Sequence, residues 1–394
     1  MAGLTSKARL TSYWQNPDGS SRPLVSAGTA INVRIPLLLL CSFPAFLAGP
    51  SLPGQQPSAS TQFQQLEKKF EVNRQPRKFI EPFLAFARTH ADDPEAIDAL
   101  TWVLKYYQRG PEADRALRLL ANHHAGNDQL VTVFQRIGRN PSLAVGQLYR
   151  AVLKQNKDPQ VLGNACMRQT EYLLRQLDLK QEIESAPEKR ERYEQFLGKA
   201  IVDHLRSLEI EAVLVEAELL CRRIETDFAE IRTFQGILGD LAERKLFTIR
   251  HLSIGRPAAN ITGDDVFGKR LQLSDFQGKV VVIDFWADWC LTCRTMYSSN
   301  RELVGKMEGR PFVLLGVNSD RDRKQTTRVI RTQGLNWRSW WDGGSTTGPI
   351  AKTWNIETWP AIYVLDHQGV IRYKNIKGTE LHRAVEKLVT AAEK

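Results

Sequence analysis

The feature that most restricts the fold is the stretch GKVVVIDFWADWCLTCR, residues 278–294, where an apolar run leads directly to two cysteines two residues apart. The apolar run is rich in β-branched residues and predicts a buried strand. The next residues, CLTCRTMYSSNRELVGKM, have the apolar spacing of a helix. Free backbone N–H groups and the positive dipole end at a helix N-terminus favour a thiolate. Two cysteines at this spacing can form a metal site, a structural bridge or a redox pair.

The rest of the C-terminal third alternates short apolar runs with helical patterns. KRLQLSDF and PFVLLGVNS predict strands, and RKQTTRVIRTQG and GPIAKTWNI predict helices. AIYVLD and VIRYKNI form a strand pair joined by HQG, and ELHRAVEKLVTAA is an amphipathic helix. This order predicts an α/β sandwich with a mixed sheet. The tryptophans of the segment either line a binding face or belong to the core, namely Trp337, Trp340, Trp341 and Trp354.

The chain before this segment has a helical pattern. From about Gln62 to Arg250, apolar residues recur at three- and four-residue spacing between Gly, Pro, Asn and Asp breaks. Longer helices are expected at about 188–205 and 210–224. The similar stretches DPEAIDAL and DPQVLGNA hint at a helical-repeat array, although no fixed period is present. We expect an all-α domain over residues 61–250, after a targeting region and linker over residues 1–60.

The CxxC segment resembles the active-site segment of the thioredoxin superfamily. The preceding IGRPAANITGDDVFGKRLQLSDFQGK resembles the entry of the TlpA-like and redoxin (AhpC/TSA-related) branch, and TWPAIYVLDHQGVIRY resembles its cis-proline loop and hairpin. The resemblance is confined to the C-terminal third, from about Leu252. It implies an α/β thioredoxin fold, a mixed sheet flanked by helices, over residues 251–394. It also implies an enzyme, a thiol-disulfide oxidoreductase of the kind that is typically exported.

The resemblance assigns roles to three residues of the motif. Cys290 is the expected nucleophile, and Cys293, one helical turn later, is the resolving thiol that attacks the mixed disulfide. Asp284 stands where thioredoxins keep a buried acid that exchanges a proton with the second cysteine. A buried carboxylate has a raised pKa and acts as a base or an acid near neutral pH. These three residues are the predicted catalytic set.

The predicted substrate-binding residues are Trp289, Trp359 and Pro360. Pro360 matches the family's cis-proline, which lets the preceding backbone pair with an extended substrate segment. Trp359 is bulkier than the residues common at its position, and together with Trp286 and Trp289 it is expected to form an aromatic rim around the thiols. The dipeptide Leu291-Thr292 also departs from the Gly-Pro of thioredoxin itself.

Other interpretations of the cysteine pair have less support. A zinc site needs more Cys or His ligands, but the sequence has no second CxxC, and His367 and His382 are isolated. A purely structural bridge around a two-residue loop stabilises little. A peroxiredoxin-like peroxidase uses a PxxxTxxC pattern, whereas Asp288 and Thr295 stand at the proline and cysteine positions around Thr292. A different alternative makes the helices a protein-interaction module with an accessory thioredoxin domain.

The N-terminal region and the charge bear on location and partners. After Arg34, the run IPLLLLCSFPAFLAGP has no charge, is short for a membrane span and contains two prolines, Pro36 and Pro44, before its final Pro50. It favours a signal peptide and a periplasmic or cell-envelope location, with an uncleaved anchor as the alternative. The net charge is +10, but the lysine and arginine residues are scattered among acidic residues, so we expect no nucleic-acid partner. The expected partners are protein thiols and disulfides and an upstream electron donor or acceptor, soluble or membrane-bound. No metal or organic cofactor is expected, because the disulfide itself carries two electrons.

Overall fold

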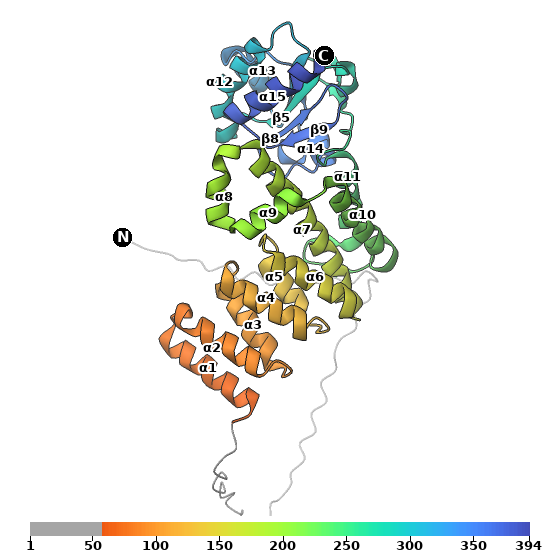
Figure 1. Cartoon of the computed structure of the whole chain (residues 1–394). Helices are drawn as coiled ribbons and strands as arrows, with labels where there is room; N and C mark the ends of the chain where they lie inside the picture. The colour runs from red at the N-terminus through yellow and green to blue at the C-terminus, as the bar shows by residue number, and fades with distance from the viewer. Residues whose placement is uncertain (1–56) are drawn as a thin grey trace, which may run out of the picture. The chain divides into compact units, whose positions relative to one another are not determined.

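Helices fill the chain from Ala59 to His251, as the spacing of apolar residues predicts (Figure 1). The structure is a computed structural model that describes residues 57–394; the predicted targeting segment lies outside the described residues. The helices of this part are α1 (Ala59–Asn73), α2 (Pro76–Thr89), α3 (Glu95–Tyr106), α4 (Pro111–His123), α5 (Leu130–Ile137), α6 (Leu143–Gln155), α7 (Pro159–Ser185), the 3-10 helix η1 (Pro187–Lys189), α8 (Arg190–Leu197), α9 (Lys199–Ser207), α10 (Ile210–Asp227) and α11 (Leu238–His251). A short hairpin of β1 (Arg232–Thr233) and β2 (Gly236–Ile237) precedes α11.

Local sequence signals explain where these helices begin and end. The side chain of Asp158 accepts a hydrogen bond from the Val161 N–H, and Pro159 occupies the first turn, so α7 starts there and runs for 27 residues. The single helix expected over 188–205 is wrong. Gly198 has φ of 92°, in the left-handed region that a continuous helix excludes, and it separates α8 from α9.

The C-terminal third contains a five-stranded mixed sheet with the strand order β7-β6-β5-β8-β9. Its strands β5 to β7 are parallel, whereas β8 is antiparallel to β5 and to β9. The elements are β3 (Thr262–Asp264), β4 (Arg270–Gln272), η2 (Leu273–Phe276), β5 (Val280–Trp286), α12 (Leu291–Lys306), β6 (Phe312–Asn318), α13 (Arg323–Thr332), β7 (Ser339–Trp341), η3 (Ser345–Thr347), α14 (Pro349–Thr353), β8 (Ala361–Leu365), β9 (Ile371–Lys374) and α15 (Gly378–Ala392). This is the predicted thioredoxin-type α/β fold.

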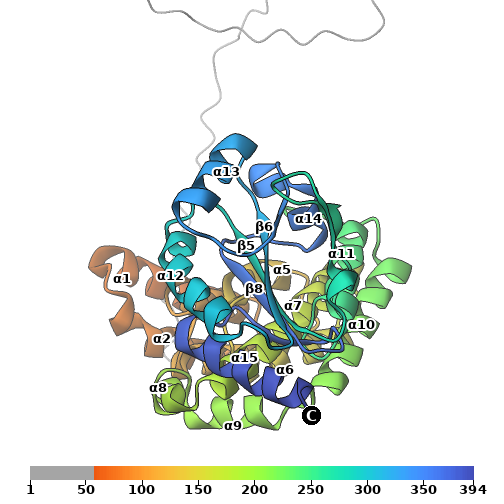
Figure 2. The same cartoon turned by 90° about the horizontal axis from the view of Figure 1, so that it is seen from above.

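Strand β5 lies at the centre of the sheet, and its side chains alternate between two buried faces. Val280 and Val282 pack in a cluster with residues of α12, α13 and α15. Val281 and Ile283 pack in a second cluster with residues of α14 and the end of α11. Figure 2 shows α12 and α15 on one side of the strands and α11 and α14 on the other. The helices therefore bury both faces of the strand that leads to the cysteines.

The tryptophans between residues 337 and 354 belong mainly to these clusters. Trp340 and Trp354 are fully buried, and Trp337 is 7% exposed. Trp341 is half-buried and donates its indole N–H to the Asp320 carbonyl at 3.2 Å. The interpretation of these tryptophans as core is therefore the better one.

The helical region contacts the sheet through α7 and α11. The Gln181 side chain of α7 accepts a hydrogen bond from the Lys374 N–H at 2.6 Å and donates one to the Lys374 carbonyl at 2.9 Å, at the outer strand β9. Near the end of α11, Thr248 accepts a hydrogen bond from the Asn355 side chain at 3.0 Å. Residues 57–394 cluster as one compact unit, so the boundary near residue 250 stays a prediction. Among the helices described there, none has the length and apolarity needed to cross a membrane.

Candidate active site

The two cysteines of the CxxC motif form a disulfide at the start of α12. Cys290 is the N-cap residue, and its sulfur accepts a hydrogen bond from the Cys293 N–H at 3.1 Å. Cys290 is 7% exposed and Cys293 is 2% exposed, so Cys290 is the more exposed of the two residues. The helix N-terminus stabilises negative charge on a cysteine sulfur at this position. The site can therefore hold a thiolate after reduction.

The other two described cysteines lie elsewhere and have no disulfide bond. Cys166 of α7 and Cys221 of α10 are buried and free. Burial raises the pKa of each thiol to about 11, so both stay protonated near neutral pH. Of the cysteines in residues 57–394, only Cys290 and Cys293 form a disulfide, and exposed side chains, Trp289 and Leu291, flank Cys290 in the chain.

Asp284 lies beneath the active-site helix, on the face of β5 that packs against α12. It is 4% exposed, its Oδ2 accepts a hydrogen bond from the Asn300 side chain at 3.0 Å, and its Oδ1 has no partner. Burial raises the pKa of this carboxyl to about 7, while the Asn300 bond and the positive charge of Lys377 act in the opposite direction. Such a group changes its charge in the pH range where disulfide exchange operates.

Asn300 is a site residue that the sequence reasoning missed. It lies two helical turns after Cys293, on the same buried face of α12. The spacing of seven residues from Cys293 was the available signal, because it places both residues above β5. Asn300 donates to the carboxylate form of Asp284 and so moderates the effect of burial on its pKa.

The loop before β8 contains the cis peptide bond between Trp359 and Pro360. The rings of Trp359 and Trp289 lie 5.6 Å apart between centroids, with an interplanar angle of 59°. The structure thus brings both predicted substrate-binding tryptophans together beside the cysteines. The expectation that Trp286 joins this rim is wrong, because it is 1% exposed and packs edge-on against Tyr297. Its position in β5 points it into the cluster beneath α12.

The end of β6 connects the two loops that carry these tryptophans. Trp359 donates its indole N–H to the Ser319 hydroxyl at 3.1 Å, and Trp289 donates to the Ser319 carbonyl at 3.4 Å. The Asp320 carboxylate accepts the Asp288 N–H with both oxygens at 3.0 Å. The carboxyl ends of the parallel strands β5 and β6 meet at one edge of the sheet, which explains the proximity. The sequence reasoning missed Ser319 and Asp320.

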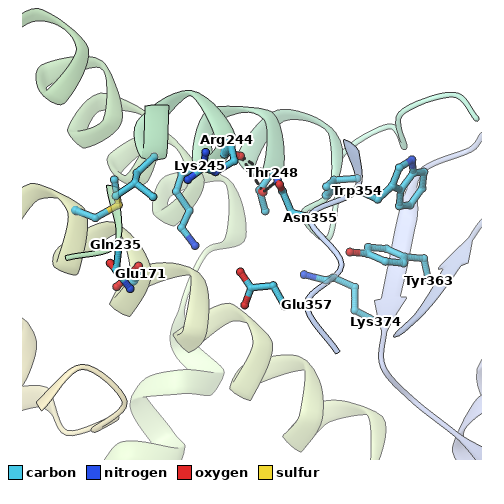
Figure 3. A pocket seen from close by; sticks show the side chains of 13 residues that line it. Glu171, Gln235, Arg244, Lys245, Thr248, Trp354, Asn355, Glu357, Tyr363 and Lys374 are labelled. Carbon is cyan, nitrogen blue, oxygen red and sulfur yellow. Dashed lines mark hydrogen bonds between the residues drawn. The ribbon is translucent and has the colours of Figure 1, made fainter. Parts of the chain in front are cut away.

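A separate cavity of about 410 Å³ lies between α7, α11 and the loop that leads to Pro360. Figure 3 shows Lys245 of α11 and Lys374 of β9 pointing into it, with the carboxylate of Glu357 between them. The side chains that line the cavity carry charges of both signs. Its importance lies in its position, because one of its walls carries Glu357, two residues before Trp359.

The comparisons with known proteins concern the C-terminal third. Residues 254–374 match the model of the AhpC/TSA family. The thiol-disulfide oxidoreductase ResA of Bacillus thuringiensis subsp. konkukian is 27% identical over 135 residues, which are 34% of this chain and 76% of that protein. The thiol:disulfide interchange protein DsbE of Yersinia pestis is 28% identical over 99 residues, 25% of this chain and 49% of that protein.

A solved thioredoxin domain of a thiol-disulfide oxidoreductase from Bacteroides vulgatus is 28% identical and covers 35% of this chain and 98% of its own, with a TM-score of 0.33. The predicted resemblance to AhpC/TSA-related, thioredoxin-like domains is confirmed for the C-terminal third. The predicted enzyme class, thiol-disulfide oxidoreductase, is confirmed with it. Within residues 57–394, no group of three or more His, Cys, Asp or Glu side chains is arranged to hold a metal ion.

Proposed function

We propose that this protein exchanges dithiol for disulfide with protein substrates outside the cytoplasm. The observation that carries the proposal is the Cys290–Cys293 disulfide at the N-terminus of α12, with the ionisable Asp284 buried below it. The Cys290 thiolate attacks a substrate disulfide, forms a mixed disulfide and releases one substrate thiol. Cys293 then attacks the Cys290 sulfur, which restores the internal disulfide and releases the second thiol. Two electrons pass to the substrate, and the same steps reversed oxidise a substrate dithiol.

Asp284 acts as the proton acceptor for Cys293 in the resolving step. The carboxyl and the thiol lie beneath the same helix, in a region that excludes water. With a pKa of about 7, the carboxyl accepts a proton in the exchange direction that oxidises the pair and returns it in the other direction. An external electron donor or acceptor resets the pair after each turnover.

The proposed location rests on the uncharged run at residues 35–50, which has the length and composition of a signal-peptide core. Outside the cytoplasm, proteins form and reshuffle disulfides, so an exchange enzyme has substrates there. Mass spectrometry of the mature N-terminus tests this part of the proposal: a chain that retains residues 35–50 contradicts cleavage.

The experiment that tests the chemistry is substitution of the two cysteines. Cys290→Ser is expected to abolish the reduction of insulin by the protein, because serine cannot form the mixed disulfide. Cys293→Ser is expected to trap the mixed disulfide on Cys290, which non-reducing electrophoresis detects. The matched control is Cys221→Ala, which removes a buried thiol and leaves the CxxC pair unchanged.

Insulin reduction that persists in the Cys290→Ser variant would contradict the proposal. Hydrogen peroxide offered to the reduced protein in place of insulin tests the peroxidase alternative. Faster oxidation by peroxide than by insulin would favour that alternative.

A further inference from the structure

Large apolar side chains are exposed at the surface next to Cys290. The residues on either side of it in the chain, Trp289 and Leu291, are 50% and 74% exposed. Large side chains exposed together at a reactive group indicate a binding surface rather than incomplete packing. Tryptophan is well suited to this role because it offers a large, rigid contact area.

Both indole N–H groups at this surface turn inward to a single residue. Trp359 donates to the Ser319 hydroxyl at 3.1 Å, and Trp289 donates to the Ser319 carbonyl at 3.4 Å. The polar edge of each ring is thereby satisfied within the protein, and the rings keep their mutual angle of 59°. The apolar parts of the rings are left for contact with a ligand.

Ser319 is itself firmly held. It is fully buried, and its N–H donates to the Trp286 carbonyl at 2.9 Å. On its two sides, the Asn318 amide donates to the Asp320 carboxylate at 2.7 Å, which also accepts the N–H of Asp288. Ser319 therefore orders both tryptophan side chains before a ligand binds. A ligand that contacts them causes little further loss of conformational entropy.

We infer that Ser319 is a positioning residue that holds Trp289 and Trp359 as an aromatic clamp. The clamp selects polypeptide substrates with an aromatic or large apolar side chain next to the reacting cysteine. The inference rests on the proposed disulfide exchange and adds the substrate class. Ser319 does not touch the reacting sulfur in this scheme; it acts through the two rings.

The test compares two peptide disulfides that differ in one residue, Phe or Ser next to the cysteine. Each is mixed in excess with pre-reduced protein, and the rate constant for oxidation of the protein is measured in a single turnover. The protein dithiol loses two electrons and two protons, and the peptide disulfide becomes two thiols. The wild-type protein is expected to prefer the Phe peptide by about five- to tenfold, from partial burial of the ring.

Ser319→Ala removes the hydroxyl that anchors Trp359 and is expected to reduce the preference below about twofold. Trp359→Phe removes the donor of the same hydrogen bond and is also expected to reduce the preference below about twofold, and the double variant should lose no more preference than Trp359→Phe alone. This second variant keeps the test valid if Ser319→Ala does not fold. The matched control is Ser298→Ala, on the exposed face of α12, which is expected to keep the preference.

Equal rates for the two peptides with the wild-type protein would overturn the inference, as would a Ser319→Ala protein that keeps the full preference. Neither result affects the proposed exchange. Failure of the proposed function is a different outcome, in which reduced wild-type protein transfers electrons to neither peptide.

Discussion

Asp284 links the stability of the protein to pH. Burial raises the pKa of its carboxyl from an ordinary value near 3.8 to about 7. Between these values the folded protein keeps a proton that the unfolded chain has already lost. The free energy of unfolding therefore falls as the pH rises from about 4 to about 7. Each unit of pKa elevation corresponds to about 1.4 kcal/mol, so the total cost is on the order of 4 kcal/mol above pH 7.

Asp284→Asn is expected to remove this cost, because an amide at the same site still accepts the Asn300 hydrogen bond and carries no charge. Urea unfolding at pH 4 and pH 8 measures the free energy of unfolding of the variant and of the wild type. The variant should be more stable than the wild type at pH 8 only. The same variant is expected to slow resolution of the mixed disulfide by about ten- to hundredfold. Equal unfolding curves at pH 8 would show that the carboxyl is not buried as a charge.

The individual site residues differ in how far the sequence reveals them. Asp284 and the redox pair were predicted from the resemblance to thioredoxins, because an acid in an apolar strand can also face solvent and a CxxC pair can also bind a metal. Trp286 was predicted to belong to the aromatic rim around the thiols. It lies two residues after Asp284 in β5, so its side chain is on the same face of the strand and points beneath α12. Ser319 becomes a site residue only once β6 lies beside β5. That pairing depends on contacts distant in sequence.

At the scale of single elements, β9 is an outer strand whose exposed backbone is partly covered by a side chain. The Gln181 amide bonds both the N–H and the carbonyl of Lys374, in the way a neighbouring strand would. Gln181 is 7% exposed, so these bonds are shielded from water. This contact fixes α7 to the sheet.

Gln181→Leu is expected to destabilise the protein by about 1–3 kcal/mol, because it leaves two partly buried backbone groups without partners. Urea unfolding gives the free energy, and amide hydrogen exchange at Lys374 should become faster. Gln65→Leu, at an exposed position of α1, is the matched control and should change neither quantity. Unchanged exchange at Lys374 in the Gln181 variant would mean that the side chain does not protect the strand.

Among the elements, the longer strands β5, β6, β8 and β9 and the helices between them were predicted in their correct order, whereas the short strands β1, β2, β3 and β7 were missed. Other errors concern the limits of helices. The pattern GPIAKTWNI suggested a helix, but α14 spans only Pro349–Thr353. Asn355 has φ of 50°, which stops the helix. Gly198 similarly divides α8 from α9. The sequence alone does not show where such a helix ends, because a glycine or asparagine can also occur inside a helix. Tertiary contacts decide whether the backbone of that residue adopts a left-handed conformation.

At the scale of the whole molecule, ion pairs, side-chain hydrogen bonds and apolar packing join the helical region to the thioredoxin-like region. Ion pairs such as Arg383–Glu188 and Arg256–Glu211 lie at the surface, where each contributes about 0–1 kcal/mol and is weakened by salt. The end of α11 also packs the partly buried Phe247 against the cluster on one face of the sheet.

α11 also supports the loop that carries Pro360. The Asn355 side chain donates to the Thr248 hydroxyl at 3.0 Å and to the Arg244 carbonyl at 3.3 Å. These bonds hold the loop four residues before Trp359, so the helical region is coupled to the active site without contacting the disulfide itself. Through this contact a change in the helical region can reach the active-site loop, which the following variant tests.

Asn355→Gly tests this coupling, because glycine accepts the left-handed backbone at this position and deletes only the side-chain bonds. The variant is expected to lose about 1–2 kcal/mol of stability and to reduce insulin about two- to fivefold more slowly. Hydrogen exchange of residues 354–361 should become faster. Ser345→Gly replaces another left-handed residue that lies outside these bonds, and it should leave insulin reduction at the wild-type rate. An Asn355→Gly protein with normal exchange in the loop and normal insulin reduction would show that α11 stabilises the fold without influencing the active site.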